Sequence, residues 1–422
     1  MSTTSHTSQR IFISAGEASG DHYGAQIIYE FTRRHPNATF FGLGGSEMES
    51  AGQQRIVRAE DVAHMGITEV LRHAPYIYGQ YRKLIRAIRE QKPDVAVLID
   101  FPDVNLRLAR ELKQHAIPVV YFVSPQLWAW KRGRLRWVQQ RVDRMLVIFP
   151  FEQDFYRARN VPADFVGHPL AELPLPTISR DDYAARYHLD PTLPWIALLP
   201  GSRSKEVRLN LPEMVAAASL IHRQQPCEFL LPIASTLDSA FVESFLPQPN
   251  SSPRITLVSD ARQALLHARA SVVASGTATV QAALIGNPFL VVYRVSNLTY
   301  RVAKHLVHYP AEVIDLTQPA PLSPAIDQHG NLPIAMVNLI AGHRIVPELL
   351  QQQFTAVNIL STITPLLTPG PTRDRALTEL ADIRRRLNSP AGSTSIHRVC
   401  DTVEQLLPAP LEQSGRNPSP SV

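Results

Sequence analysis

Short apolar runs alternate with amphipathic stretches through most of this 422-residue chain, and that alternation restricts its fold more than any other feature. The first series of runs lacks the apolar–polar alternation of half-exposed strands, so parallel strands covered by helices on both faces are expected. The expected strands are residues 11–14, 39–43, 95–99, 119–123, 145–148 and 165–167. Amphipathic stretches such as 76–90 and 105–114 supply the covering helices.

A second series of the same kind follows a proline-rich connector at residues 173–177. Its expected strands are residues 195–199, 229–233, 255–258, 271–274 and 289–293. The sequence therefore predicts an α/β protein with two doubly wound, Rossmann-like domains whose strands end at a central cleft. We place the domains at 1–170 and 171–408, with the final helices free to pack back on the first domain, and expect a disordered tail at 409–422. Residues 308–333 carry five prolines and are expected to form a long loop.

Composition excludes several classes of protein. No run approaches the ~18 consecutive apolar residues of a membrane-spanning helix. The first ten residues are polar and the apolar run behind them is too short for a signal-peptide core, so a cytoplasmic protein is expected. The two cysteines, Cys227 and Cys400, allow at most one disulfide and no cysteine metal cluster, and neither a metal nor a cofactor is expected. The net charge of +5 suits phosphate-bearing ligands or an anionic lipid surface without selecting either.

The first motif is Ala-Gly-Glu-Ala-Ser-Gly-Asp at residues 15–21, between the first expected strand and a helix expected to start near His22. Glycines at 16 and 20 let the backbone approach a ligand, and the free N–H groups of a helix start favour anions. A tight structural turn would explain the two glycines alone. Glu17, Ser19 and Asp21 in the same turn favour a ligand site. The candidate residues of this loop are Gly16, Glu17, Ser19, Gly20 and Asp21.

The second motif places Asp100, Asp103 and Asn105 directly after the most apolar expected strand. The carboxyl end of a central strand is where α/β enzymes hold their chemistry, and a partly buried carboxylate there can act as a general base. The alternative is that Asp103 or Asn105 caps the next helix. A cap would leave the other carboxylate unexplained.

The third motif is Ser-Pro-Gln-Leu-Trp-Ala-Trp at residues 124–130, followed by a run of basic residues. Tryptophan beside arginine suits a membrane interface, so Trp128, Trp130 and Arg132 are expected to face an anionic membrane. A solvated helix face or a nucleic-acid patch are the alternatives. No nucleic-acid-binding signature accompanies the motif, so no nucleic-acid partner is expected.

Two motifs in the second domain predict a site for a nucleotide diphosphate. Leu-Leu-Pro-Gly-Ser-Arg at residues 198–203 leads from a strand into a helix and presents Arg203, an arginine being suited to bidentate phosphate contact. Ala-Ser-Gly-Thr-Ala-Thr at residues 274–279 places small and hydroxyl residues at another helix start, which favours phosphate. The candidate residues are Ser202, Arg203, Glu206, Ser275, Gly276, Thr277 and Thr279.

Together these motifs resemble those of the lipid-A-disaccharide synthase family from about residue 10 to about residue 355. The resemblance also rests on Met-Gly-Ile-Thr-Glu-Val-Leu at 65–71, Pro-Phe-Glu at 150–152 and Val-Gly-His-Pro-Leu at 166–170. It implies a GT-B fold and an inverting transfer from UDP-2,3-diacylglucosamine to 2,3-diacylglucosamine 1-phosphate (lipid X), giving the β-1,6-linked disaccharide 1-phosphate and UDP. It also implies a peripheral enzyme on the cytoplasmic face of the inner membrane.

The resemblance assigns roles to particular residues. The essential acidic residue falls on Asp100, with Glu17 the rival base, and the essential arginine falls on Arg203. Residues 275–279 would hold the UDP end of the donor, together with Gln281, Asn338 and Glu348. The chain departs from the family at three places. Gln281 stands where a glutamate is usual, Ala-Met-Val-Asn at 335–338 keeps only the asparagine of the usual Ser-Leu-Pro-Asn, and the loop at 308–333 looks inserted.

Two other readings are open. One is a different GT-B enzyme acting on a UDP-amino sugar, such as a 2-epimerase or a peptidoglycan-type transferase. The other is a non-catalytic module that binds a sugar nucleotide. The oligomeric state is left open by the sequence.

Overall fold

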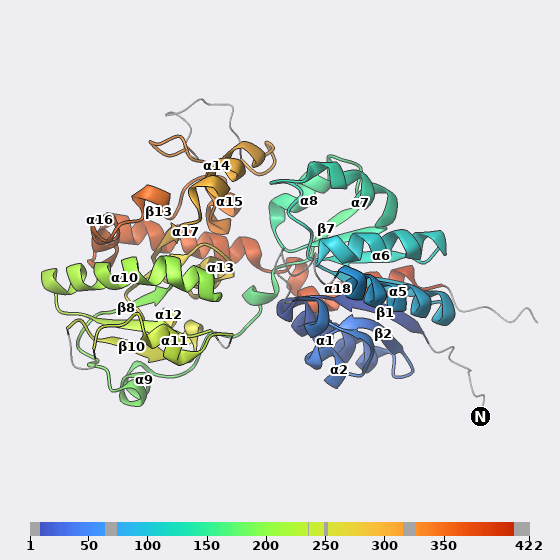
Figure 1. Cartoon of the computed structure of the whole chain (residues 1–422), viewed down its shortest axis with the longest axis horizontal. Helices are drawn as coiled ribbons and strands as arrows, with labels where there is room; N and C mark the ends of the chain where they lie inside the picture. Colours follow the sequence, from blue (N-terminus) through green and yellow to red (C-terminus); the bar gives the residue numbers. More distant parts are fainter. Residues whose placement is uncertain (1–8, 64–73, 235, 249–251, 315–325, 409–422) are drawn as a thin grey trace, which may run out of the picture.

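The computed structural model describes residues 9–63, 74–234, 236–248, 252–314 and 326–408. Two α/β domains, each built on a parallel sheet, lie side by side along the long axis of the molecule (Figure 1). The expected tail at 409–422 and the motif at 65–71 lie outside the described residues. The described parts of the proline-rich loop, 308–314 and 326–333, contain no helix or strand.

The first domain contains a seven-stranded parallel sheet with the order β3-β2-β1-β4-β5-β6-β7. Its strands are β1 (Arg10–Ala15), β2 (Thr39–Gly44), β3 (Gln53–Arg58), β4 (Val95–Ile99), β5 (Val119–Phe122), β6 (Arg144–Val147) and β7 (Ala163–Phe165). Five of the six predicted strands are present, whereas the one predicted at 165–167 lies two residues earlier, as β7, and only residue 165 is shared. Strand β4 is buried along its whole length, as expected for a central strand covered on both faces. The sequence did not predict β3, because this strand is polar and lies at the edge of the sheet.

The second domain contains a six-stranded parallel sheet with the order β10-β9-β8-β11-β12-β13. Its strands are β8 (Trp195–Leu199), β9 (Glu228–Pro232), β10 (Ile255–Val258), β11 (Ala270–Ala274), β12 (Phe289–Tyr293) and β13 (Glu348–Leu350). The five predicted strands are present. The sixth, β13, has only three residues and offers no pattern that could be recognised in the sequence.

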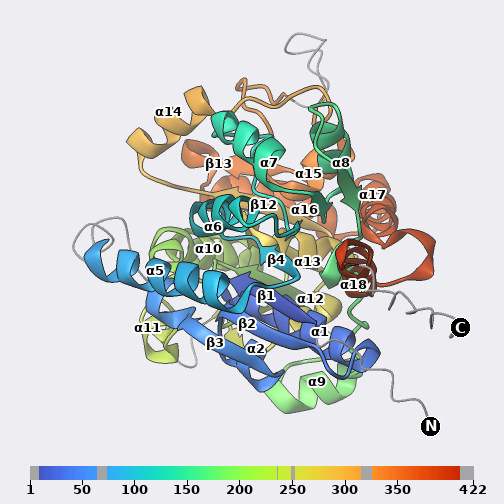
Figure 2. The ribbon, with the colours of Figure 1, turned by 90° about the vertical axis from the view of Figure 1, so that its right-hand side faces the viewer.

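Helices pack against both sheets, and Figure 2 shows them from the first-domain end. The first domain has α1 (Ala18–Arg34), α2 (Ser46–Ser50), α3 (Glu60–Ala63), α5 (Ala74–Gln91), α6 (Pro102–Gln114), η1 (Arg132–Arg134), α7 (Leu135–Arg141) and α8 (Pro150–Arg157). From the connector onward the chain has η2 (Pro169–Ala171), α9 (Arg180–Tyr187), α10 (Ser204–Gln224), α11 (Ser239–Glu243), α12 (Ala261–His267), α13 (Thr277–Ile285) and α14 (Asn297–Leu306). The remaining helices are α15 (Met336–Ala341), η3 (Gln351–Gln353), α16 (Ala356–Leu367), α17 (Pro371–Leu387), η4 (Pro390–Gly392) and α18 (Ser395–Leu406).

The strand orders bring two pairs of loops together. In the first sheet β1 pairs with β2 on one side and β4 on the other, so that Ala15 lies beside Ile99 where both strands end. In the second sheet β8 pairs in the same way with β9 and β11. Doubly wound sheets bind ligands at such points, where the strand order reverses. The loops after β1 and β4, and those after β8 and β11, are therefore where a ligand site is expected.

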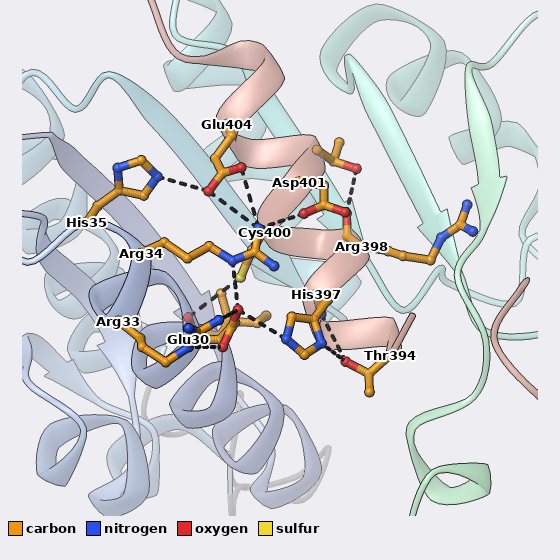
Figure 3. Close-up of polar contacts among 12 residues, drawn as sticks. Glu30, Arg33, Arg34, His35, Thr394, His397, Arg398, Cys400, Asp401 and Glu404 are labelled. Carbon is orange, nitrogen blue, oxygen red and sulfur yellow. Dashed lines mark hydrogen bonds and ion pairs between the residues drawn. The ribbon is translucent and has the colours of Figure 1, made fainter. Parts of the chain in front are cut away.

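The described chain ends with α18, which returns to the first domain and packs against α1 (Figure 3). Arg34 of α1 donates to Asp401 of α18 at 2.6 Å, and the carboxylate of Glu30 lies 3.1 Å from His397 Nε2. Beneath these polar contacts the apolar face of α18, including Val399 and Cys400, is buried. The C-terminal helix is thus part of the first domain's structure although it follows the second domain in the chain.

Candidate active site

The loop after β1 approaches the loop after β4 closely. Gly16 is buried, and a Cβ at this position would lie 2.3–2.6 Å from ring atoms of Phe101, so a larger residue would push the two loops apart. Helix α1 begins at Ala18, earlier than the expected start near His22, with Glu17 at the N-cap in an extended conformation. Glu17 and Ser19 are exposed at the end of the sheet.

Asp21 has a structural role that the sequence did not indicate. Its carboxylate is buried and accepts hydrogen bonds from the backbone N–H groups of Gly45 (2.7 Å), Glu47 (3.0 Å) and Met48 (3.2 Å). These are the first N–H groups of α2, which have no partner within that helix. The nearby Gly20 is also buried and allows α1 to pack on Ala15. The expectation that Asp21 faces a ligand is therefore wrong.

The loop after β4 holds Asp100 in an unusual backbone conformation. Asp100 and Phe101 both have positive φ, 45° and 47°, a region that residues other than glycine occupy at a cost of about 1 kcal/mol or more each. The carbonyl of Asp100 accepts hydrogen bonds from Tyr121 Oη (2.6 Å) and Asn105 Nδ2 (2.8 Å), and its N–H donates to Phe122. These three hydrogen bonds fix the main chain of Asp100, and none of them involves its side-chain carboxylate.

The Asp100 carboxylate is in an environment that disfavours its charge. Burial and, to a smaller extent, the negative charge of Glu17 raise the pKa of Asp100 to about 6, against the opposing effect of a hydrogen bond from the backbone of Phe101. The structure therefore brings the two candidate bases of the sequence analysis together. A carboxylate with a pKa near 6 is largely ionised at neutral pH and is a stronger proton acceptor than an exposed aspartate.

Neither candidate cap in this segment caps the helix. The N-cap of α6 is Phe101, which makes no side-chain capping bond, and Asp103 lies inside the first turn with an exposed side chain that pairs with Arg134. Asn105 is buried; it accepts a hydrogen bond from Ser14 Oγ at 2.7 Å and donates to the carbonyl of Ile99 at 3.1 Å. Asn105 therefore links the ends of β1 and β4 and supports the Asp100 loop.

The motif at 124–130 contains one buried and one exposed tryptophan. Trp128 is only 1% exposed, and its Nε1 donates to the buried carboxylate of Glu152 at 3.0 Å. The prediction that Trp128 faces a membrane is therefore wrong. Trp130 is 45% exposed, with the Lys131 ammonium 4.2 Å from its ring centroid, and Arg132 is also exposed.

Glu152 is a deeply buried acid next to this motif, and no role was predicted for it. Its Oε1 also accepts from Ser124 Oγ at 2.7 Å, and its Oε2 accepts from the backbone N–H of Phe149 at 3.2 Å. Burial raises the pKa of Glu152 to about 7, while the hydrogen bonds from Ser124 and Trp128 oppose that rise. Its place in the motif Pro-Phe-Glu was the only available signal.

In the second domain the loop after β8 leaves Arg203 in solvent. The Arg203 side chain is 79% exposed, and its nearest acidic partner is Glu206 at 3.4 Å. Glu206 also accepts from the backbone N–H of Ser202 at 3.1 Å, which shapes the turn into α10. The guanidinium is free to reach toward a phosphate, whereas Glu206 is occupied in holding the loop.

The loop after β11 exposes the start of α13. Gly276 has a φ of +149° and open space around its Cα, and both Gly276 and Thr277 are exposed. Ser275 is half-buried and its N–H donates to the carbonyl of Val292. Thr279 is fully buried and its hydroxyl donates to the Gly276 carbonyl at 2.8 Å, so it supports the turn instead of facing a ligand. Because β8 and β11 are neighbours, this loop and the Arg203 loop lie at the same end of the sheet.

Three other predicted donor-binding residues are placed less favourably. Asn338 and Glu348 are buried, and Glu348 accepts from Asn338 Nδ2 (2.8 Å) and Ala335 N (2.9 Å) and pairs with Arg344 (2.9 Å). Their polar groups are satisfied within the domain. Gln281 is half-buried and lines a cavity of about 10 Å³ beside the connector between the domains.

Among the described residues, no group of three or more His, Cys, Asp or Glu side chains is arranged to hold a metal ion. Within the same residues no helix is long and apolar enough to cross a membrane.

Comparison with other proteins connects this geometry to a family. A profile of the lipid-A-disaccharide synthetase family matches residues 11–317. The chain is 54% identical over 409 residues to a lipid-A-disaccharide synthase of Acidobacterium capsulatum, an alignment that covers 94% of this chain and 96% of the relative. It is 48% identical over 384 residues to that of Koribacter versatilis, with 90% and 94% covered. The chain belongs to the lipid-A-disaccharide synthetase family.

Solved structures show the same fold at low sequence identity. The calicheamicin glycosyltransferase CalG4 superposes with a TM-score of 0.57 and 17% identity, covering 95% of this chain and 99% of that one. A UDP-GlcNAc 2-epimerase from Neisseria meningitidis gives 0.59 and 12%, covering 94% and 100%. The GT-B fold is thus confirmed, although it is shared by transferases and epimerases. Family membership makes this chain a glycosyltransferase of lipid A disaccharide synthesis.

Proposed function

We propose that the chain transfers the diacylglucosaminyl group of UDP-2,3-diacylglucosamine to the 6-hydroxyl of 2,3-diacylglucosamine 1-phosphate (lipid X), with inversion at the anomeric carbon. The products are the β-1,6-linked disaccharide 1-phosphate and UDP. The single observation that carries the mechanism is Asp100, whose carboxylate has a pKa raised by burial and by the charge of Glu17 and lies on a loop with positive φ. The names of the relatives and the shared motifs support the choice of substrates.

In this proposal Asp100 is the general base. A sugar hydroxyl is a poor nucleophile at neutral pH, so its proton must be accepted as the oxygen attacks the anomeric carbon. The acceptor hydroxyl forms the new C–O bond, Asp100 takes the proton, and the bond to UDP breaks with its electron pair leaving on the diphosphate. The fixed main chain of Asp100, held by Asn105 and Tyr121, keeps the carboxylate in one position.

The leaving UDP is assigned to the second domain. Arg203 supplies a cation that can bind the diphosphate with two N–H groups, and the exposed N–H groups at the start of α13 add the positive end of a helix dipole. Both act where negative charge develops on the leaving group. Ser275, Gly276 and Thr277 are the residues of this loop that remain placed to contact it.

Product analysis tests the reaction. Purified enzyme with UDP-2,3-diacylglucosamine and lipid X should give a disaccharide monophosphate by mass spectrometry, and UDP in equal amount. Release of an epimerised sugar nucleotide without lipid X, or UDP binding without any product, would point to one of the two alternative functions.

The base is identified by comparing Asp100→Asn, Asp103→Asn and Glu17→Gln. General-base catalysis contributes about 10²–10⁴-fold, so Asp100→Asn should lower turnover by about that factor and leave UDP affinity unchanged. Asp103→Asn is the matched control, because this exposed neighbour pairs only with Arg134 among the described residues. Loss of activity in Glu17→Gln with normal turnover in Asp100→Asn would show that Glu17 is the base.

A pH profile separates the two carboxylates further. Turnover of the wild type should rise with pH as Asp100, with its pKa of about 6, loses its proton. Glu17→Gln removes a negative charge that raises this pKa, so the rising limb should move to lower pH while activity persists. An unmoved limb would contradict the coupling between the two residues.

Arg203→Ala tests the donor site. Loss of a charge-assisted phosphate contact costs about 1.5–3 kcal/mol, which corresponds to about a tenfold or larger loss of UDP affinity by calorimetry. Lys205→Ala, an exposed cation on the same turn of α10, is the control and should bind UDP normally. If Arg203→Ala and Lys205→Ala bound UDP with equal affinity, Arg203 would not contribute to UDP binding in the ground state.

The proposal includes peripheral attachment to the cytoplasmic face of the inner membrane through the Trp130–Arg132 loop of the first domain. An exposed tryptophan with adjacent cations is suited to the headgroup region of an anionic bilayer. Replacing Trp130 and Arg132 by alanine should reduce sedimentation with phosphatidylglycerol vesicles at low salt. Unchanged sedimentation would show that attachment uses another surface.

A further inference from the structure

Helix α14 of the second domain has an apolar stripe that is fully open to solvent. Leu298, Val302 and Leu306 are 74%, 48% and 59% exposed, and their spacing of four residues places them on one face of the helix. No residue of α14 is buried. Most exposed large hydrophobic side chains elsewhere in the described chain occur singly, whereas these three form a continuous row.

The stripe is bordered by positive charge. The helix sequence Asn-Leu-Thr-Tyr-Arg-Val-Ala-Lys-His-Leu contains Arg301, Lys304 and His305 and no acidic residue. Among the described residues of the segments that follow, the acidic groups Glu312 and Asp327 are paired, with Arg159 at 3.0 Å and Arg344 at 3.9 Å respectively. A short amphipathic helix with cations and no anions fits an apolar layer beneath an anionic surface.

The attachment of α14 to the protein leaves its apolar stripe outward. Tyr300, on the opposite side, donates to Asn331 at 2.8 Å, and Lys304 Nζ lies 3.5 Å from the same oxygen. Ser296 caps the start of the helix by accepting from the N–H of Thr299 at 3.1 Å. The helix is therefore held in place by its polar side, with the apolar side available to a partner.

The segment that follows the C-terminal end of α14 is hydrogen-bonded to the Trp130–Arg132 loop of the first domain and to the adjacent Ala129. His308, two residues beyond the helix, donates its N–H to the carbonyl of Ala129 at 3.3 Å, and its own carbonyl accepts from Arg132. In both Figure 1 and Figure 2, α14 lies at the same end of the molecule as α7, which follows that loop. Helix α14 and the Trp130–Arg132 loop thus lie on the same side of the molecule.

We propose that α14 is an interfacial helix through which the second domain binds an anionic lipid bilayer, next to the Trp130–Arg132 loop. Leu298, Val302 and Leu306 enter the boundary between headgroups and acyl chains, and Arg301, which flanks the stripe, contacts lipid phosphates. Both domains then contact the same bilayer, which fixes how their facing loops meet a substrate carried in it. The choice of a bilayer as the partner rests on the proposed function, in which both substrates are carried by lipids. The exposure of the stripe is observed independently of that function.

The test is vesicle binding by the full chain without substrates. Leu298→Gln, Val302→Gln and Leu306→Gln are combined, because glutamine keeps helix propensity while removing apolar surface. Affinity for vesicles of phosphatidylglycerol and phosphatidylcholine should fall about tenfold or more, and Arg301→Gln should weaken binding chiefly at low salt. The control pair is Val357→Gln and Leu377→Gln, exposed apolar residues on α16 and α17, which should bind as the wild type does.

Three further readouts make the result decisive. Thermal melting and UDP affinity should be unchanged in the α14 variant, and its turnover in detergent micelles should be near normal, since neither depends on a bilayer. Normal vesicle binding by this variant would overturn the inference. Sedimentation showing that the variant loses a self-association of the wild type, with vesicle binding intact, would assign the stripe to a second copy of the chain instead. Absence of turnover in the wild type in micelles would contradict the proposed function and leave the vesicle result standing.

Discussion

The pKa of Asp100 leads to a prediction about stability that is independent of any substrate. An aspartate whose pKa rises on folding binds a proton more tightly in the folded state than in the unfolded state. Its contribution to the free energy of unfolding is therefore lost as pH rises from its ordinary pKa of 3.8 through about 6, and the cost persists above that range. Asp100→Asn removes the charge and should stabilise the protein at neutral and alkaline pH.

The magnitude follows from the size of the shift. A rise from 3.8 to about 6 corresponds to at most about 3 kcal/mol when Asp100 is fully ionised, and to about 1 kcal/mol near pH 4.5, where it is mostly protonated in the folded state. The advantage of Asp100→Asn over the wild type should thus grow by about 2 kcal/mol between about pH 4.5 and about pH 8. Loss of the backbone hydrogen bond from Phe101 makes this an upper value.

Urea unfolding of the first domain, followed by tryptophan fluorescence at the two pH values, measures this difference. Asp103→Asn is the control, because its exposed carboxylate loses an ion pair with Arg134 and should gain no stability. If Asp100→Asn were equally or less stable than the wild type at alkaline pH, the carboxylate would not be destabilised by burial and Glu17. Asp100 would then be no stronger a base than an exposed aspartate.

Three other substitutions test the supports of the site. Glu152→Ala leaves Trp128 Nε1 and two other donors without an acceptor and opens a cavity, so unfolding in urea should require about 3 kcal/mol less. Asp21→Ala removes the acceptor for the N–H groups at the start of α2 and should cost about 1–2 kcal/mol, with faster amide exchange there. Gly16→Ala places a methyl against the ring of Phe101 and should lower turnover without changing UDP affinity.

The fold was largely predictable because parallel strands covered on both faces are apolar along their whole length. Strands β4 and β8 are buried at every position and stand out in the sequence for that reason. Strands β3 and β13 were missed, since one is a polar edge strand and the other has three residues. Their positions depend on pairing with a neighbour and not on a pattern of their own.

The candidate site was predictable in position but only partly in the direction of its side chains. Asp100 and Arg203 were recognised because they follow strand ends at points where the strand order reverses. Asp21 and Trp128 were misassigned because their partners, the start of α2 and Glu152, lie more than twenty residues away in the chain. A motif identifies a candidate residue, whereas the burial of that residue's side chain depends on contacts with distant residues that the sequence does not reveal.

The contacts that join α18 to the first domain are stronger than the ion pair that joins the two domains at Glu312. Helix α18 is tied to the first domain by buried side chains such as Val399 and Cys400, each worth about 1–2 kcal/mol or more. The ion pair between Arg159 and Glu312, from opposite domains, is half-exposed and is worth at most about 1 kcal/mol. Relative motion of the domains should therefore break the Glu312 contact and bend the connecting segments at 172–179 and 388–394, while α18 moves with the first domain.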